Sequence, residues 1–261
     1  AHLIYNFALP PLVLHTFRVG NASLLSEWAR QLETPSTETT FLNFLASHDG
    51  IGLNAVSEIL SAQEIDALVQ NTVMHGGMIS YKQNTDGSQS AYEMNINFFD
   101  ALSDPSSSEP LTLQVRRFLT AQAIMLSLRG LPGIYFHSLF GSRSWREGVT
   151  LSGQARSINR QKLTFEGLEE ELQSSTSLRA LVFSGFQRLL KQRSNSQGTQ
   201  EILPLGEGIF AVLRKSMDGS DRMLCLHNVT NETQIAGSWR LAPYETRWLH
   251  NPEGYGFTGR R

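Results

Sequence analysis

The chain has 261 residues, of which 40% are hydrophobic and 18% are charged. This balance is typical of a protein with a packed core and excludes disorder as the main state. With 22 Lys and Arg against 24 Asp and Glu, the formal charge is -2, so we expect neither nucleic acid nor a membrane surface as a partner. No run approaches the roughly 18 consecutive apolar residues of a membrane span. The single cysteine, Cys225, suits a buried thiol in a cytoplasmic protein.

Strands and helices are expected to alternate through the first part of the chain. Short apolar runs at 2–7, 40–46 and 133–136 predict three strands, and helical spacing follows the first run from Pro10 and precedes the third from Pro110. Between the second and third strands, about 50–109 is expected to be a loop insertion. This alternation predicts a parallel α/β fold.

The loop insertion is expected to contain a helix followed by two extended segments. Ser61 and Glu64 form a capping-box pattern, so a helix should begin there and end at Gly76-Gly77. The extended segments, 78–82 and 92–96, are separated by the turn pair Asp86-Gly87.

The last part of the chain changes from helical to β character. The segment 164–193 predicts one helix, and the Ser-, Asn- and Gly-rich stretch 194–198 is expected to be a linker. Short β-rich runs then predict a small antiparallel domain at 199–250, followed by a tail at 251–261. The expected domains are therefore 1–198 and 199–250.

A polar cluster, Ser47-His48-Asp49-Gly50, follows the second predicted strand. Parallel α/β folds bind ligands beyond the carboxyl ends of their strands. A carboxylate beside an imidazole in that position could stabilise developing positive charge on a substrate. The alternative is an ordinary turn, because Asp and Gly together are common turn residues.

Four ordered motifs, and a further segment near the end of the chain, resemble one family. The run from Phe44 to Gly52 looks like the seventh-strand motif of the α-amylase superfamily, glycoside hydrolase family 13, in its sucrose phosphorylase branch. The segment from Tyr5 to Leu12 is similar to the sixth strand and its helix, and that from Leu131 to Phe136 resembles the eighth strand. Ser157 to Arg160 resembles the stretch that carries a sugar-binding arginine, and 241–245 is like the closing strand of the C-terminal domain.

The resemblance implies an incomplete TIM (β/α)8 barrel, strands six to eight, followed by a small antiparallel β domain. Within the branch, the segments 76–82 and 92–97 look most similar to enzymes acting on glucosylglycerate or on sucrose 6'-phosphate. Plain sucrose phosphorylases tend to have glutamine where Glu93 stands, so sucrose itself is less expected as the substrate.

The resemblance also implies a retaining double displacement, in which phosphate releases α-glucose 1-phosphate from an α-glucoside. Asp49 would be the third carboxylate, which stabilises the oxocarbenium-like transition state, and His48 and Arg160 would bind the same glucosyl unit. Tyr92 and Glu93 would face the acceptor or phosphate site, and His137 and Arg143 are further candidate ligands of phosphate or carboxylate. We expect no cofactor and no metal.

The sequence departs from the family in its catalytic pair. No Arg-x-Asp motif occurs, and no Glu ends a strand-like run before residue 40, so neither the nucleophile nor the acid/base is present. We expect the chain alone to be inactive and to need the N-terminal half of the barrel as a partner, as a truncated piece of a longer enzyme would. The alternatives are a related α-glucosidase or transglucosidase, or a non-catalytic sugar-binding remnant.

Overall fold

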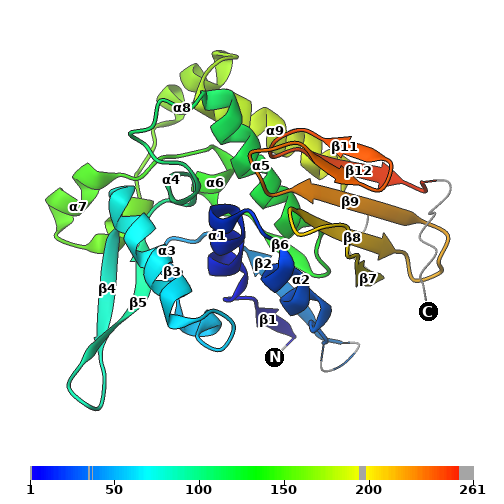
Figure 1. Ribbon diagram of the computed structural model, residues 1–261. Helices are drawn as coiled ribbons and strands as arrows, with labels where there is room; N and C mark the ends of the chain where they lie inside the picture. Colours follow the sequence, from blue (N-terminus) through cyan, green and yellow to red (C-terminus); the bar gives the residue numbers. More distant parts are fainter. Residues whose placement is uncertain (1, 35, 37, 194–197, 253–261) are drawn as a thin grey trace.

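A three-stranded parallel sheet lies at the centre of the computed structural model, which describes residues 2–252 apart from 35, 37 and 194–197 (Figure 1). Its strands are β1 (Leu3–Tyr5), β2 (Thr40–Phe44) and β6 (Leu131–Gly133), in the order β1-β2-β6. The parallel α/β prediction is confirmed for these strands. Because all three run in one direction, their carboxyl ends share one edge, and the turn with Asp49 leaves the middle strand there.

Two helices join β1 to β2. They are α1 (Leu9–Val19) and α2 (Ser23–Arg30). Pro10 and Pro11 lie in the first turn of α1, where a missing N–H breaks no helical hydrogen bond. Leu9 and Leu12 are fully buried, so α1 contributes its apolar face to the core that covers the sheet.

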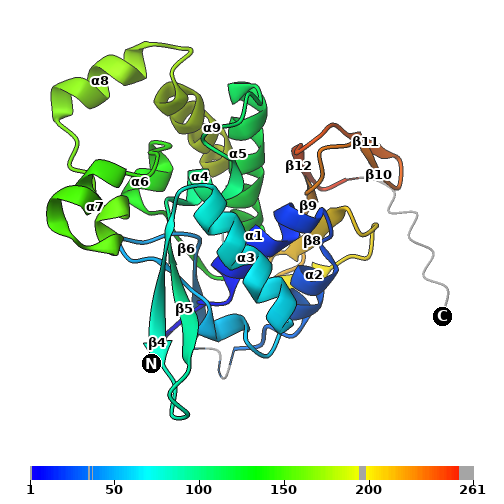
Figure 2. The ribbon, with the colours of Figure 1, turned by 60° about the vertical axis from the view of Figure 1, so that its left-hand side comes forward.

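The predicted insertion contains a small antiparallel sheet and a capped helix. Its elements are β3 (Ile51–Gly52), η1 (Asn54–Val56), α3 (Ala62–Met74), β4 (Met78–Gln83) and β5 (Gln89–Asn95), with sheet order β3-β5-β4. The predicted capping box is confirmed, since Ser61 and Glu64 bond reciprocally at the start of α3. The β4–β5 hairpin projects from the rest of the molecule in both ribbon views (Figure 2).

Helix α4 (Phe98–Leu102) lies near the end of the predicted insertion, α5 (Leu111–Ser127) follows it, and a group of short helices follows β6. These short helices are α6 (Phe136–Leu139), α7 (Arg146–Ser152) and η2 (Ala155–Asn159). The prediction of a strand at 133–136 was wrong in its position. The strand starts at Leu131, directly after Gly130 with its φ of 127°, and it ends before Phe136 because helix α6 begins there.

Two helices occupy the segment in which one was predicted. They are α8 (Phe165–Gln173) and α9 (Leu178–Gln192). The break arises because the Ser177 hydroxyl accepts a hydrogen bond from the Ala180 N–H at 3.0 Å, which starts a new helix. Most of the predicted linker, 194–197, lies outside the described residues.

A four-stranded antiparallel sheet forms most of the C-terminal region, in the order β12-β9-β8-β7. Its strands are β7 (Thr199–Ile202), β8 (Ile209–Lys215), β9 (Arg222–Asn228) and β12 (Thr246–His250), and a separate hairpin comprises β10 (Gln234–Ala236) and β11 (Trp239–Leu241). Cys225 in β9 is buried as predicted, and burial raises the pKa of its thiol to about 12. The predicted tail lies outside the described residues from 253 onward.

Helix α5 packs against both the helical part of the chain and the C-terminal sheet, because it contacts α9 as well as β8 and β9. The Thr120 hydroxyl donates to the main-chain oxygen of Tyr244 at 2.6 Å. At the end of α5, Arg193 donates to the carbonyl oxygens of Leu126 and, just beyond the helix, Gly130, and Arg214 donates to that of Ser127 at 3.1 Å. Guanidinium groups therefore satisfy carbonyls that the helix end leaves free.

No helix in the described part of the chain is both long and apolar enough to span a membrane.

Candidate functional site

Asp49 lies at the carboxyl edge of the parallel sheet, in a turn just beyond β2. The Ser47 hydroxyl accepts a hydrogen bond from the Asp49 N–H at 3.1 Å, which fixes the local bend. The Asp49 side chain is 37% exposed and lines a cavity of about 530 Å³. Asp49 is therefore both a turn residue and a cavity-lining residue, so the two interpretations of this segment do not exclude each other.

Two arginines hold the Asp49 carboxylate. The Arg160 Nη2 donates to Asp49 Oδ1 at 3.1 Å, and its Nε donates to the main-chain oxygen of His48 at 2.9 Å. Arg156 Nη1 lies 3.1 Å from the same Oδ1. The Asn159 side-chain amide also donates to the Asp49 carbonyl at 3.1 Å. The short helix η2 and the residue after it therefore fix both the charge and the backbone of this turn.

Tyr135 supports the same segment from the end of β6. Its hydroxyl donates to the carbonyl of Asn159 at 2.6 Å. Burial raises the pKa of Tyr135, and the nearby Arg160 opposes that rise. This contact anchors the residue next to Arg160 onto the strand edge.

His48 lies beside Asp49 but points more toward solvent. Its Nε2 is 3.6 Å from Asp49 Oδ1, and its side chain is 67% exposed. Among the described residues, His48 is not one of those that line the cavity. The imidazole of His48 therefore lies beside the Asp49 carboxylate, at the rim of the cavity and not inside it.

Glu93 and Tyr92 enter the site from strand β5, and both line the cavity. The Glu93 side chain is only 5% exposed, and both of its carboxylate oxygens accept hydrogen bonds from Arg156, at 3.1 Å and 2.9 Å. These bonds raise the pKa of the Arg156 guanidinium. The insertion therefore reaches Asp49 through a buried carboxylate and one arginine.

Aromatic rings form the side of the cavity nearest β1 and β2. Phe7 and Phe44 both line it and meet edge to face, with ring centroids 5.4 Å apart. Phe7 is 57% exposed, so part of its ring is open to a ligand. The cavity thus combines an apolar wall with a charged one, as small-molecule sites commonly do.

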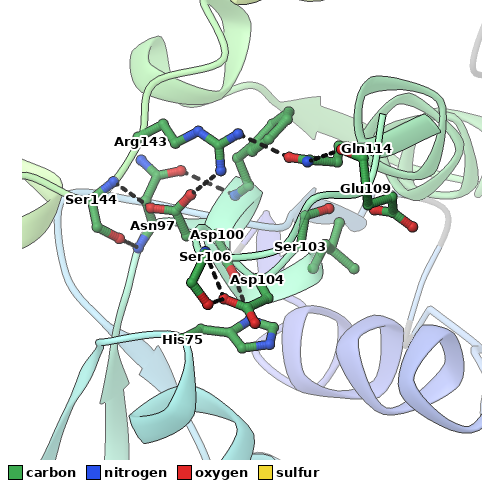
Figure 3. A network of polar contacts seen from close by, with 12 residues as sticks. His75, Asn97, Asp100, Ser103, Asp104, Ser106, Glu109, Gln114, Arg143 and Ser144 are labelled. Carbon is green, nitrogen blue, oxygen red and sulfur yellow. Dashed lines mark hydrogen bonds and ion pairs between the residues drawn. The ribbon is translucent and has the colours of Figure 1, made fainter. Parts of the chain in front are cut away.

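The structure does not bring His137 and Arg143 to this cavity. Arg143 donates to Asp100 and to Gln114, each at 2.8 Å (Figure 3). Asp100 also accepts from the Ser144 N–H at 2.7 Å, and its carbonyl oxygen lies 2.6 Å from Nδ1 of His75. This network joins the end of α3 to α4 and to the start of α5. In this structure Arg143 is thus committed to a buried carboxylate.

His137 is buried in helix α6, with its Nδ1 2.8 Å from the Ser142 hydroxyl. Burial lowers the pKa of its imidazole, and the nearby Arg179 lowers it further. A substrate role for His137 or Arg143 stays a prediction that none of these contacts tests.

Arg156 is the residue that sequence reasoning missed. It precedes Arg160 by four positions, immediately before the segment 157–160 that resembles the sugar-binding stretch. That proximity was the only available signal, because its partner Glu93 is 63 residues away in the chain. In the described part of the molecule, no group of three His, Cys, Asp or Glu side chains could hold a metal ion.

Curated proteins of one kind resemble this chain over most of its length. The glucosylglycerate phosphorylase of Spirochaeta thermophila is 47% identical over 239 residues, which cover 90% of this chain and 40% of that protein. The glucosylglycerate phosphorylase of Escherichia coli is 39% identical over 271 residues, covering 95% of this chain and 48% of that protein. A sucrose phosphorylase of Agrobacterium vitis is 30% identical over 60% of this chain and 31% of its own length. The chain spans less than half the length of each relative.

A solved structure shares the fold. The sucrose 6F-phosphate phosphorylase from Thermoanaerobacter thermosaccharolyticum matches with a TM-score of 0.76 at 20% identity, over 96% of this chain and 46% of that one. No family model matches the chain.

Proposed function

Because the chain belongs to the family of the glucosylglycerate and sucrose phosphorylases, we propose that it forms the C-terminal part of a retaining glycoside phosphorylase. The substrates would be an α-glucoside, with glucosylglycerate first among the candidates, and inorganic phosphate. The products would be α-glucose 1-phosphate and the released alcohol. Strands from outside this sequence would complete the barrel and supply the nucleophile and the acid/base.

The placement of Asp49 carries this proposal. The carboxylate lines a cavity at the carboxyl edge of parallel strands, where α/β barrels bind their substrates. A carboxylate at that position stabilises the positive charge that develops on the sugar ring as the glycosidic bond breaks. Arg160, through its bond to Oδ1, would orient Asp49 and bind the glucosyl unit, and His48 would bind a hydroxyl at the rim.

The nucleophile and the acid/base would come from the missing part of the barrel. In a double displacement, a carboxylate attacks the anomeric carbon, and an acid protonates the leaving oxygen. Phosphate then attacks the same carbon from the opposite side and displaces the enzyme carboxylate, so the anomeric configuration is retained. The chain's part in both steps is to bind the sugar and to stabilise the charged transition states.

A chimera tests the proposal. The residues of this chain would replace the matched portion of the Spirochaeta thermophila relative, and a thermal melt would establish that the product is folded. We expect α-glucose 1-phosphate to form from glucosylglycerate only when phosphate is present. Asp49→Asn should lower turnover by about two to four orders of magnitude, whereas Asp66→Asn, at an exposed position on α3, should leave it unchanged.

Three results would contradict the proposal. Equal sugar release without phosphate would favour a hydrolase or transglucosidase. A folded chimera without turnover would favour a sugar-binding remnant. Full activity in Asp49→Asn would remove the carboxylate from the reaction.

A further inference from the structure

Arg156 lies between the buried Glu93 and the half-exposed Asp49. Its Nε and Nη2 donate to the two carboxylate oxygens of Glu93, at 3.1 Å and 2.9 Å. Its Nη1 lies 3.1 Å from Asp49 Oδ1. The Arg156 side chain is itself 43% exposed and lines the cavity. One edge of the guanidinium is therefore fixed in the protein, while the opposite edge remains accessible.

Glu93 is held tightly behind this arginine. The backbone at Gly50 packs so closely that an added Cβ would lie 2.5 Å from Glu93 Cγ and 2.7 Å from the Met94 carbonyl oxygen. Glu93 therefore has no room to rotate toward Gly50. With both oxygens bonded to Arg156, it sets the plane of the guanidinium.

The accessible edge of Arg156 has donors to spare. A guanidinium carries five N–H groups, and Glu93 accepts from one on Nε and one on Nη2. The hydrogens that remain are on Nη1 and Nη2. Two such N–H groups form a fork that matches a carboxylate or a phosphate, and a fork held in place binds these anions more selectively than a lysine does.

Local charges allow an anion to bind at this edge. The negative charge of Glu93 balances the positive charge of Arg156. Arg160 balances the charge of Asp49 through its own hydrogen bond to Oδ1. Asp49 is thus not dependent on Arg156 for a partner. An incoming oxyanion can compete with Asp49 for the exposed Nη1 edge of Arg156 without leaving the Asp49 carboxylate unpaired.

We infer that Arg156 is a specificity-determining residue that binds the oxyanion of the group exchanged with the glucosyl unit, and that Glu93 positions it. The oxyanion is either the carboxylate of glycerate as the leaving group or inorganic phosphate as the attacking group. Arg156 thereby makes the site selective for an anionic partner, while Asp49 and Arg160 serve the sugar.

Binding by the chain itself tests this inference, which rests on the proposed function, without requiring turnover. Calorimetric titrations with D-glycerate, inorganic phosphate and uncharged glycerol would be made at constant ionic strength. The proteins would be the unchanged chain, Arg156→Lys, Arg156→Gln, Glu93→Gln and the control Arg188→Lys. Arg188 is an exposed residue on α9 that does not line this cavity among the described residues.

We expect an anion to bind at least about tenfold more tightly than glycerol, and Arg156→Lys to weaken it by about tenfold through loss of the fork. Arg156→Gln should abolish the preference for an anion over glycerol. Glu93→Gln should also weaken anion binding, although it removes a negative charge, because the guanidinium would turn toward Asp49. Binding of glycerate alone assigns the leaving group to Arg156, and binding of phosphate alone assigns the attacking group.

Several results would overturn the inference. These are equal affinity for glycerol and the anions, unchanged anion binding in both Arg156 variants that remain folded, or tighter anion binding in Glu93→Gln. Because turnover is not measured, anion binding as expected would stand even if the chimera proved inactive.

Discussion

Gly50 and Gly52 form a matched pair for measuring how tightly the Asp49 turn is packed against β5. A Cβ at position 50 would lie 2.5 Å from Glu93 Cγ and 2.7 Å from the Met94 carbonyl oxygen, whereas a Cβ at position 52 meets nothing within 4 Å. Neither glycine has a positive φ. The backbone conformation therefore accepts alanine at both positions, and only the steric contact differs.

The expected effect follows from that contact. Alanine in place of glycine reduces the entropy of the unfolded chain, which stabilises a protein by about 0.4–1 kcal/mol where no strain arises. Gly52→Ala should show this gain. Gly50→Ala has the same gain but must displace Glu93 or the β5 backbone, and such overpacking costs about 1–3 kcal/mol. The difference between the two variants isolates the steric cost, because the entropic gain is common to both.

Urea unfolding followed by tryptophan fluorescence measures both variants against the unchanged chain. We expect Gly50→Ala to be less stable than Gly52→Ala by about 1–3 kcal/mol. Gly50→Ala should also bind anions more weakly, since a displaced Glu93 no longer holds Arg156. Equal stability of the two variants would refute the close packing of the Asp49 turn on Glu93.

Three further predictions concern stability. Ser61→Ala should lower the free energy of unfolding by about 0.5–2 kcal/mol through loss of the α3 cap; an unchanged urea midpoint would contradict it. Thr120→Val should cost about 1–3 kcal/mol, because the buried Tyr244 carbonyl loses its donor, and calorimetry should show a lower melting temperature. His227 is fully buried, and burial lowers the pKa of its imidazole from 6.5 to about 3. Between these pH values the His227 imidazole is protonated in the unfolded chain and neutral in the folded chain. Its contribution to stability is therefore fully present above pH 6.5 and decreases as the pH falls toward 3. His227 contributes about 1.4 kcal/mol per pH unit to that loss, and urea unfolding at pH 7 and pH 5 should show a shallower decrease in His227→Gln.

Local signals in the sequence were sufficient for the elements that depend on neighbouring residues. The Ser61 and Glu64 pair predicts the start of α3 because both halves of the cap lie within one turn. The strands at the ends of the chain follow from short apolar runs. The apolar pattern placed β6 two residues too late, although the resemblance to the eighth strand covers 131–136, because Leu131-Pro132-Gly133 lacks the β-branched residues typical of strands. Its pairing with β2 is a tertiary contact that overrides local preference.

The candidate site was predictable where it follows a strand and not where it depends on distant pairing. Asp49 and His48 could be singled out because they come directly after β2. The partners of Glu93 and Arg143 could not be predicted, because they are distant in the chain. Arg156 lies 63 residues from Glu93, and Arg143 lies 43 residues from Asp100. A sequence shows that a guanidinium suits an anion, but only the fold shows whether a carboxylate of the protein already occupies it.

Arg193, which follows α9, and Arg214, in strand β8 of the C-terminal sheet, both bind the end of α5 and constrain the two sides of this junction unequally. Arg193 and Arg214 end on main-chain oxygens, and any residue type supplies such an acceptor. As far as these bonds are concerned, the side chains at 126 and 127 are free to vary over evolutionary time. The guanidinium groups are not, because no other side chain offers a comparable set of forked donors. Homologous proteins that keep this junction should therefore vary at 126 and 127 more readily than at the two basic residues or at Gly130, where a Cβ would lie 2.6 Å from the Phe41 carbonyl oxygen.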